Sequence, residues 1–128
     1  MLKWIRLLPI VLVVAAAIVF VFQVEGRGAY AWRNAVPMLA VLTLAALCLQ
    51  RGDGRYTGAG WQWPLGTAGF AIPAMGLSLY LHYAYATDLY GMVSDSLYPA
   101  ELFRYLPIYT LVAGAIGFAI GWIAGRDV

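Results

Sequence analysis

The stretch LLPIVLVVAAAIVFVFQV, residues 7–24, decides the fold. It carries no charged side chain, and its one strongly polar residue, Gln23, stands beside its end. A helix that crosses a bilayer needs about 20 mostly apolar residues. Lys3 and Arg6 precede the stretch as they would in a signal peptide, but the apolar run is longer than the core of a typical one. We therefore expect a retained first membrane-spanning helix.

The rest of the chain has the same character. Of its 128 residues, 63% are hydrophobic and 11% are charged, whereas soluble domains are about 45–50% apolar and about 25% charged. A soluble domain of this size could not bury so much apolar surface in one core. The composition excludes a soluble enzyme, a nucleic-acid-binding domain and a disordered tail. It indicates an integral membrane protein with a single transmembrane domain over residues 1–128.

Three further apolar segments follow, and prolines mark them. Pro73 lies near the middle of the third segment and predicts a kink, and Pro107 stands at the entrance of the fourth. Tryptophan and tyrosine gather at the segment ends, as is typical of the membrane interface. The sequence predicts an all-α fold, an integral membrane four-helix bundle. Its expected spans are approximately residues 7–24, 31–50, 64–86 and 106–124.

The basic residues predict the orientation. Four spans put both termini on one side, which carries Lys3, Arg6, Arg51, Arg55 and Arg126, while Arg27, Arg33 and Arg104 fall on the other. The side richer in Lys and Arg is the cytoplasmic one, so we expect cytoplasmic N- and C-termini in a plasma (inner) membrane, with dual topology still open. The acids Glu25, Asp88, Asp95 and Glu101 are expected outside, and Glu25 in the short loop that it begins.

Two loops carry candidate binding residues. The glycine-rich loop 51–60 lacks the spacing of a nucleotide-binding loop, and we interpret it as a flexible cytoplasmic turn whose Arg51 and Arg55 touch anionic lipid headgroups. In the long outer loop, Pro99 predicts the start of a short interfacial helix that ends where the chain turns inward at Pro107. This loop either covers the bundle or docks a ligand or protein, with candidate residues Asp88, Asp95, Glu101 and Arg104.

The fourth span carries the sharpest pattern, GxxxGxxxG. Gly117, Gly121 and Gly125 form it, and Ala113 extends it by one step. Small residues at this spacing let two helices approach closely in a membrane. The pattern predicts a tight helix contact, and it leaves open whether the partner is the small-residue-rich third helix, a second copy of the chain or another subunit.

One ionisable residue, His82, falls inside a predicted span. It shares a helix face with Ser78 and Tyr85. Three roles remain open: an interfacial histidine bonded to a neighbour or headgroup, a proton relay or ligand site, and a metal or haem site. The histidine, cysteine and acidic residues lack metal-ligand spacing, and Cys48 is expected as a small apolar residue inside a helix. We therefore expect no cofactor and no metal.

These observations favour a non-catalytic polytopic membrane protein. We expect an accessory or scaffold subunit of a membrane complex, or a homo-oligomer that packs through small-residue helix faces. One alternative is a small oligomeric transporter or channel whose kinked third helix lines the path. Another is a membrane redox or enzyme subunit that uses His82. The expected partners are membrane lipids and other membrane subunits or the chain itself, and no nucleic acid.

Overall fold

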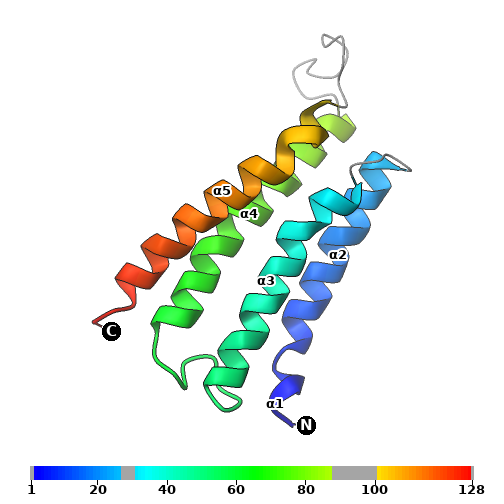
Figure 1. Cartoon of the computed structure of the whole chain (residues 1–128). Coiled ribbons are helices and arrows are strands. Elements are labelled where there is room, and N and C mark those ends of the chain that lie inside the picture. The colour runs from blue at the N-terminus through cyan, green and yellow to red at the C-terminus, as the bar shows by residue number, and fades with distance from the viewer. Residues whose placement is uncertain (1, 27–30, 88–100, 128) are drawn as a thin grey trace.

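The computed structural model describes residues 2–26, 31–87 and 101–127, and it is helical nearly throughout (Figure 1). Of Leu2, Lys3, Glu101 and Leu102 only the backbone is described. A short helix, α1 (Leu2–Ile5), precedes four long ones. These are α2 (Leu8–Glu25), α3 (Ala31–Arg51), α4 (Gln62–Thr87) and α5 (Glu101–Ala124).

Each of the four long helices is long and apolar enough to cross a membrane. The predicted all-helical fold with four apolar helices is thus confirmed, and α2 and α3 match their predicted bounds within one residue. Pro9 falls in the first turn of α2, where its missing N–H is not needed. Gly26, with φ of 64°, ends that helix in a conformation that favours glycine.

The start of α5 differs from the prediction. Residues from Glu101 onward form one continuous helix through Pro107, so the chain does not break there. Pro107 has no N–H to bond the carbonyl of Phe103 one turn earlier, and the side-chain amide of Asn34 donates to that carbonyl instead, at 3.1 Å. This bond gives the Phe103 carbonyl oxygen the donor that Pro107 cannot supply. The predicted helix start at Pro99 lies outside the described residues.

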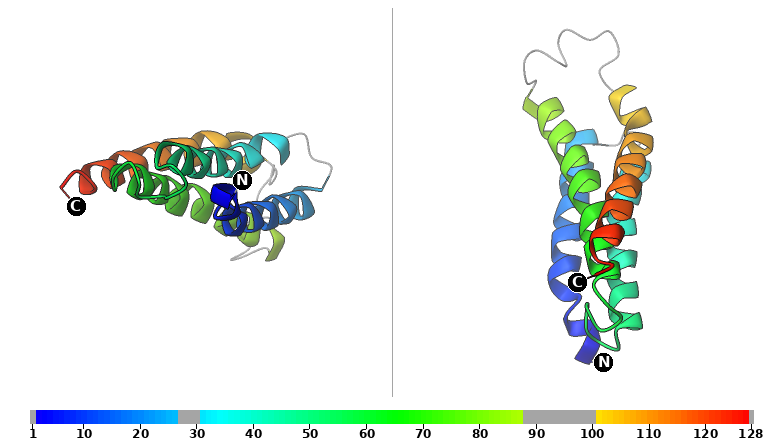
Figure 2. Two further views of the ribbon diagram at one scale, coloured as in Figure 1. Left: turned by 90° about the horizontal axis from the view of Figure 1, so that it is seen from below. Right: turned by 90° about the vertical axis from the view of Figure 1, so that its left-hand side faces the viewer.

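The helices form two antiparallel hairpins, α2 with α3 and α4 with α5, which lie side by side (Figures 1 and 2). Both chain termini lie at the same end as the loop between α3 and α4 (Figure 1), and we name this the termini end. The opposite end holds the end of α2 and the start of α3. The hairpins meet over one apolar cluster, made of Val14, Ala17, Val21, Met38, Val41, Phe70, Ala74 and Met75.

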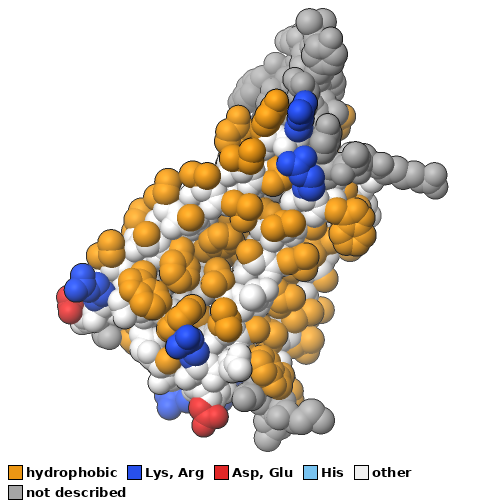
Figure 3. Space-filling model, in the orientation of Figure 1, with side chains coloured by type: hydrophobic (Ala, Val, Ile, Leu, Met, Phe, Trp, Pro, Cys, Tyr) orange, Lys and Arg blue, Asp and Glu red, His pale blue; other side chains and the backbone are white. Residues whose placement is uncertain are grey.

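The outward faces of the helices are apolar too. Trp32 and Ile72 are each 74% exposed, and hydrophobic side chains cover most of the face seen in Figure 3. Charged side chains on this face gather toward the two ends of the helices (Figure 3). Such a surface suits a hydrocarbon surrounding better than water.

The loop at the termini end is a compact, bonded turn. Arg6 donates from Nη1 to the carbonyl oxygen of Gly54 at 2.7 Å, and the Tyr56 hydroxyl donates to the carbonyl of Arg6 at 2.7 Å. Burial raises the pKa of the Tyr56 hydroxyl, so it remains a donor at ordinary pH. A Cβ on Gly52 would overlap the carbonyl oxygen of Arg55. The loop is therefore tied to the chain ahead of α2.

Candidate functional site

His82 lies in the interior of the bundle, near the end of α4. Its side chain is completely buried, and its Nδ1 is 2.7 Å from the backbone carbonyl oxygen of Ser78, one turn earlier. A carbonyl oxygen only accepts hydrogen bonds, so Nδ1 must carry the proton. The Ser78 hydroxyl also lies nearby, with Oγ at 3.5 Å from Nδ1. The backbone of α4 thus fixes both the orientation of the imidazole and the nitrogen that donates.

The other imidazole nitrogen meets a carboxyl group. Nε2 of His82 is 2.6 Å from Oε2 of Glu25, whose side chain is 2% exposed. Because Nδ1 already carries a proton, one further proton lies between Nε2 and Oε2, shared by an imidazolium and a carboxylate or by an imidazole and a carboxylic acid. Either form makes the pair neutral as a unit. A neutral pair is the form in which such groups are least costly to bury.

The position of Glu25 corrects the sequence-based prediction. It was expected to begin the short first loop, but it is the last residue of α2 and its side chain turns into the bundle. The helix continues one residue beyond the apolar run, and the turn starts only at Gly26. The carboxyl group finds two hydrogen-bond partners inside, His82 and Asn34, which together replace its contact with water.

Asn34, in the first turn of α3, joins the remaining helices to this pair. Its Nδ2 donates to Glu25 Oε2 at 2.9 Å and to the carbonyl oxygen of Phe103 at 3.1 Å. Since both partners are acceptors, the amide orientation follows from the bonds themselves. Its Oδ1 is buried without a hydrogen-bond partner. The polar cluster of Glu25, Asn34, Ser78 and His82, closed by the Phe103 carbonyl, therefore connects all four long helices.

Aromatic rings close the cluster on one side. The Phe103 ring stacks on the His82 imidazole, with ring centres 4.7 Å apart and planes inclined by 21°. Tyr85 packs its ring edge on the same phenyl group, also at 4.7 Å. Ser78, His82 and Tyr85 thus share a face as the sequence predicted, but Tyr85 packs against Phe103 and no bond joins it to the histidine among the described contacts. The rings shield the pair from its surroundings.

This arrangement limits the chemistry that the cluster can perform. No three His, Cys, Asp or Glu side chains come together as metal ligands within residues 2–26, 31–87 and 101–127. Both side chains of the pair are sealed from the surroundings of the bundle. In the observed state its effect is mechanical: it joins the α2–α3 hairpin to the α4–α5 hairpin.

The structure places the GxxxGxxxG glycines against α4 of the same chain. A Cβ on Gly117 would overlap the carbonyl oxygen of Gly69, and a Cβ on Gly121 would overlap that of Leu65. Pro73 cannot donate to the Gly69 carbonyl, so this oxygen is free to meet the Cα of Gly117 in a weak C–H···O contact. The two backbones touch, and no side chain fits between them.

The two ends of the glycine pattern, Gly125 and Ala113, differ in burial. Gly125 is buried against the backbone of Gln62 and Trp61 at the start of α4. Ala113 is only half-buried. Its neighbour Gly114 is buried instead, with the ring of Phe70 where a Cβ would stand.

The remaining predicted site residues are not brought to the polar cluster. Asp88 and Asp95 lie outside the described residues. Glu101 begins α5, and its side chain is not described. Arg104 is exposed, with its guanidinium 5.5 Å from the ring centre of Tyr105. At the termini end, Arg55 is exposed, and Arg51 holds its guanidinium 4.8 Å above the ring of Trp63.

Reasoning from the sequence missed Glu25 and Asn34 as site residues. Both flank the short first loop, where polar residues are expected in contact with water. A usable signal was present: a buried histidine requires a partner, and Glu25 ends α2, which runs parallel to α4 and finishes at the same end of the bundle as His82. That signal becomes decisive only once the helices are placed next to each other.

Comparisons with known proteins return nothing similar. The chain matches no known protein family, no curated protein and no solved structure.

Proposed function

We propose that this chain is a non-catalytic integral membrane protein that acts by helix packing, as an accessory or scaffold subunit of a membrane complex. One observation carries the proposal: the buried polar side chains that are described bond to one another or to their own helices. Thr110, for example, donates to the carbonyl of Leu106 at 3.0 Å. The grooves between the helices are lined almost wholly by apolar side chains. None of these three grooves is lined by a histidine, a cysteine or an acidic side chain.

The glycine contacts bear on the kind of assembly. Gly117 and Gly121 are occupied by α4 of the same chain, so they do not supply a face for a second copy. What remains for a partner is the apolar outward surface of the helices. This favours a complex with other membrane subunits over a homo-oligomer built on the glycines. We further propose that the termini end faces the cytoplasm, a choice supported by Arg6, Arg51 and Arg55 at that end.

The experiment is gentle purification of the tagged chain from its native membrane, followed by mass spectrometry and measurement of particle mass. We expect another membrane protein in a fixed ratio to the chain. Recovery of the chain alone, as a monomer or as a pure homo-oligomer, would contradict the proposal.

The variant His82→Gln then separates a packing role from a chemical one. We expect less assembled complex, because the bond to Glu25 is weakened, but unchanged activity for each complex that assembles. The matched control is Tyr85→Phe, which keeps the ring on Phe103 and leaves the cluster intact. If activity per assembled complex fell with His82→Gln and not with Tyr85→Phe, the histidine would have a chemical role instead.

The Glu25–His82 pair favours a second candidate function, a small proton-linked transporter. A carboxyl and an imidazole within hydrogen-bond distance are groups that proton pathways use. His82 lies beside Ser78 on α4, the helix predicted to line a path, and Glu25 reaches it from α2. Proteoliposomes with an imposed pH gradient test this candidate. It requires a flux that both Glu25→Gln and His82→Gln abolish. Absence of flux over a broad panel of solutes, or flux that survives both changes, would eliminate it.

A further inference from the structure

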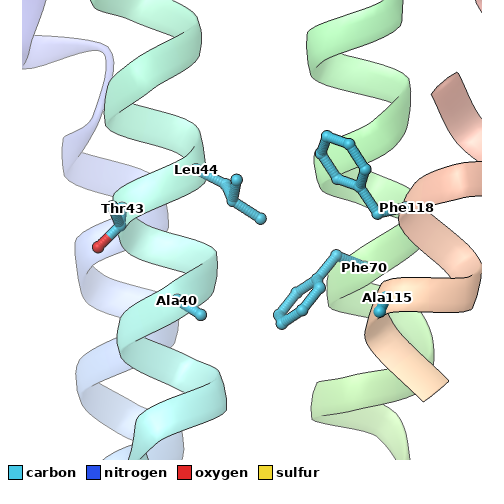
Figure 4. Close-up of a pocket in the computed structure, with 6 residues that line it drawn as sticks. All are labelled: Ala40, Thr43, Leu44, Phe70, Ala115 and Phe118. Atoms are coloured by element: carbon cyan, nitrogen blue, oxygen red, sulfur yellow. The ribbon is translucent and has the colours of Figure 1, made fainter. Parts of the chain in front are cut away.

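An apolar groove runs between α3 and the α4–α5 hairpin. Its upper part has a volume of about 490 Å³, and Leu44, Phe70 and Phe118 point into it from opposite walls (Figure 4). Small side chains also line it, Ala40 from α3 and Ala115 from α5 (Figure 4). The two hairpins are therefore in contact at the apolar cluster of Val14, Met38 and Phe70. They are separated along this groove.

A second groove continues the first toward the termini end. Its volume is about 420 Å³, and it is lined by Trp63, Phe118, Ala119, Trp122 and Ile123. Phe118 borders both grooves, so the two adjoin at this ring, and we name them together the channel. Trp63, at its lower part, is the ring over which Arg51 holds its guanidinium, at 4.8 Å. An apolar channel thus leads to a cationic group.

The residues on α3 are in register for a single elongated occupant. Ala40, Leu44 and Arg51 stand at i, i+4 and i+11, which places them on one face of the helix. At a rise of 1.5 Å per residue, Ala40 and Arg51 are about 16 Å apart along the axis. One leaflet of a bilayer has a hydrocarbon depth of about 15 Å, half of the roughly 30 Å core. The stretch of α3 from Ala40 to Arg51 is therefore about as long as a leaflet is deep.

The charges at the lower end select the headgroup. Arg51, Arg55 and Arg126 are exposed at this end of the bundle, and the exposed acids on the same end are Asp53 and Asp127. The arginines outnumber the acids. A guanidinium stacked on an aromatic ring is pre-oriented and still has N–H donors for a phosphate. An anionic lipid gains from this excess of positive charge, whereas a zwitterionic lipid gains less.

We propose that this channel binds one acyl chain of an anionic phospholipid, with the lipid phosphate bonded to Arg51. The acyl chain lies against Phe118, Leu44 and Phe70, and its end reaches the level of Ala40. The bound lipid fills the gap between the hairpins on the side away from α2. This inference goes beyond the packing function, because it assigns a specific ligand to a site on this chain.

The test uses the purified full chain in nanodiscs that contain equal amounts of phosphatidylglycerol and phosphatidylcholine, followed by native mass spectrometry of the lipid retained after release. We expect one retained phosphatidylglycerol per chain. Arg51→Gln should lower that retention about fivefold, since a phosphate contact by one arginine is worth roughly this factor. Arg51→Lys should restore part of it. Arg55→Gln removes the same charge from the same end outside the channel and should lower retention much less than Arg51→Gln, because Arg55 contributes only to the surrounding positive charge.

A second pair of variants tests the acyl-chain part of the site independently. Ala115→Leu fills the channel without touching Arg51, and Ala15→Leu adds the same bulk to an exposed position of α2. We expect lost retention for Ala115→Leu alone. Equal losses for Arg51→Gln and Arg55→Gln would overturn the proposal in favour of general surface charge. Undiminished retention in Ala115→Leu, or equal retention of the two lipids by the wild type, would overturn it as well.

Discussion

The two junctions of this bundle are built on opposite principles. Between α4 and α5 the backbones touch at Gly69, Gly117 and Gly121, and no polar side chain takes part in those contacts. Between the two hairpins, an apolar cluster is supplemented at one end by the bonds of Glu25, Asn34 and His82. An open channel remains alongside. The first junction depends on shape, and the second depends on the pairing of a few polar groups.

These two kinds of helix contact are sensitive to different substitutions. A close backbone contact tolerates no added atom, because neither helix can move a backbone aside. A polar cluster tolerates changes of shape better, but it loses free energy when one partner is removed and the other stays buried. Substitutions of each kind can test which junction controls assembly of the bundle.

The largest effect is expected at the glycine contact. Gly117→Leu drives a side chain into the Gly69 carbonyl and the Pro73 ring. We expect a loss of more than about 3 kcal/mol in the free energy of unfolding, above the usual range for overpacking, because the obstacle is backbone. Unfolding in mixed micelles measures it.

The matched control for this glycine is Gly76→Ala on α4. A Cβ at Gly76 meets nothing within 4 Å, so alanine should raise stability by up to about 1 kcal/mol through helix propensity. If Gly117→Leu were as mild as Gly76→Ala, the close contact between α4 and α5 would not be the one described.

The next largest effect is expected at the Glu25–His82 pair. Glu25→Ala leaves the imidazole buried without its partner at 2.6 Å, and we expect a loss of about 3 kcal/mol. The double variant with His82→Ala should be less destabilised than the sum of the single changes, with a coupling of at least about 1 kcal/mol. A double-mutant cycle by unfolding in detergent measures this coupling. Strict additivity would show that the two groups do not interact.

A smaller effect is expected for Asn34→Ala. It removes two bonds from the cluster, including the one to the Phe103 carbonyl that Pro107 leaves open, but it also removes the unpaired Oδ1. We expect a loss of about 1–2 kcal/mol, below that of Glu25→Ala, because no ionisable group loses its principal partner. Thr43→Ala, at an exposed site bonded only within α3, should change stability by less than about 0.5 kcal/mol. A loss at Asn34 no larger than at Thr43 would remove this residue from the cluster.

Sequence reasoning could predict the helices but not all of the contacts between them. The apolar runs predict four helices because each run is long enough to satisfy its backbone bonds within itself, and the structure shows those helices close to their predicted bounds. The glycine pattern predicts a close contact but names no partner, since a second copy of the helix would satisfy it as well as α4. Only the packed chain shows that Gly117 meets Gly69.

The candidate site shows where prediction from sequence stops. Ser78 and His82 follow from their spacing on one helix, since residues four apart share a face. Glu25 was assigned to the loop because an acid that follows an apolar run is usually solvated. Its turn into the bundle depends on the donors that His82 and Asn34 present from other helices, and those donors are distant in the sequence.

The sequence by itself determined that this chain forms four apolar helices, because composition and backbone hydrogen bonding are local properties of each segment. Tertiary structure alone decided which glycine meets which carbonyl, that the Glu25 carboxyl meets the His82 imidazole, and that a groove remains beside Phe118. The physical reason is that contacts between helices depend on the rotation and offset of whole helices. These are set by the packing of all the helices together, and no single segment encodes them.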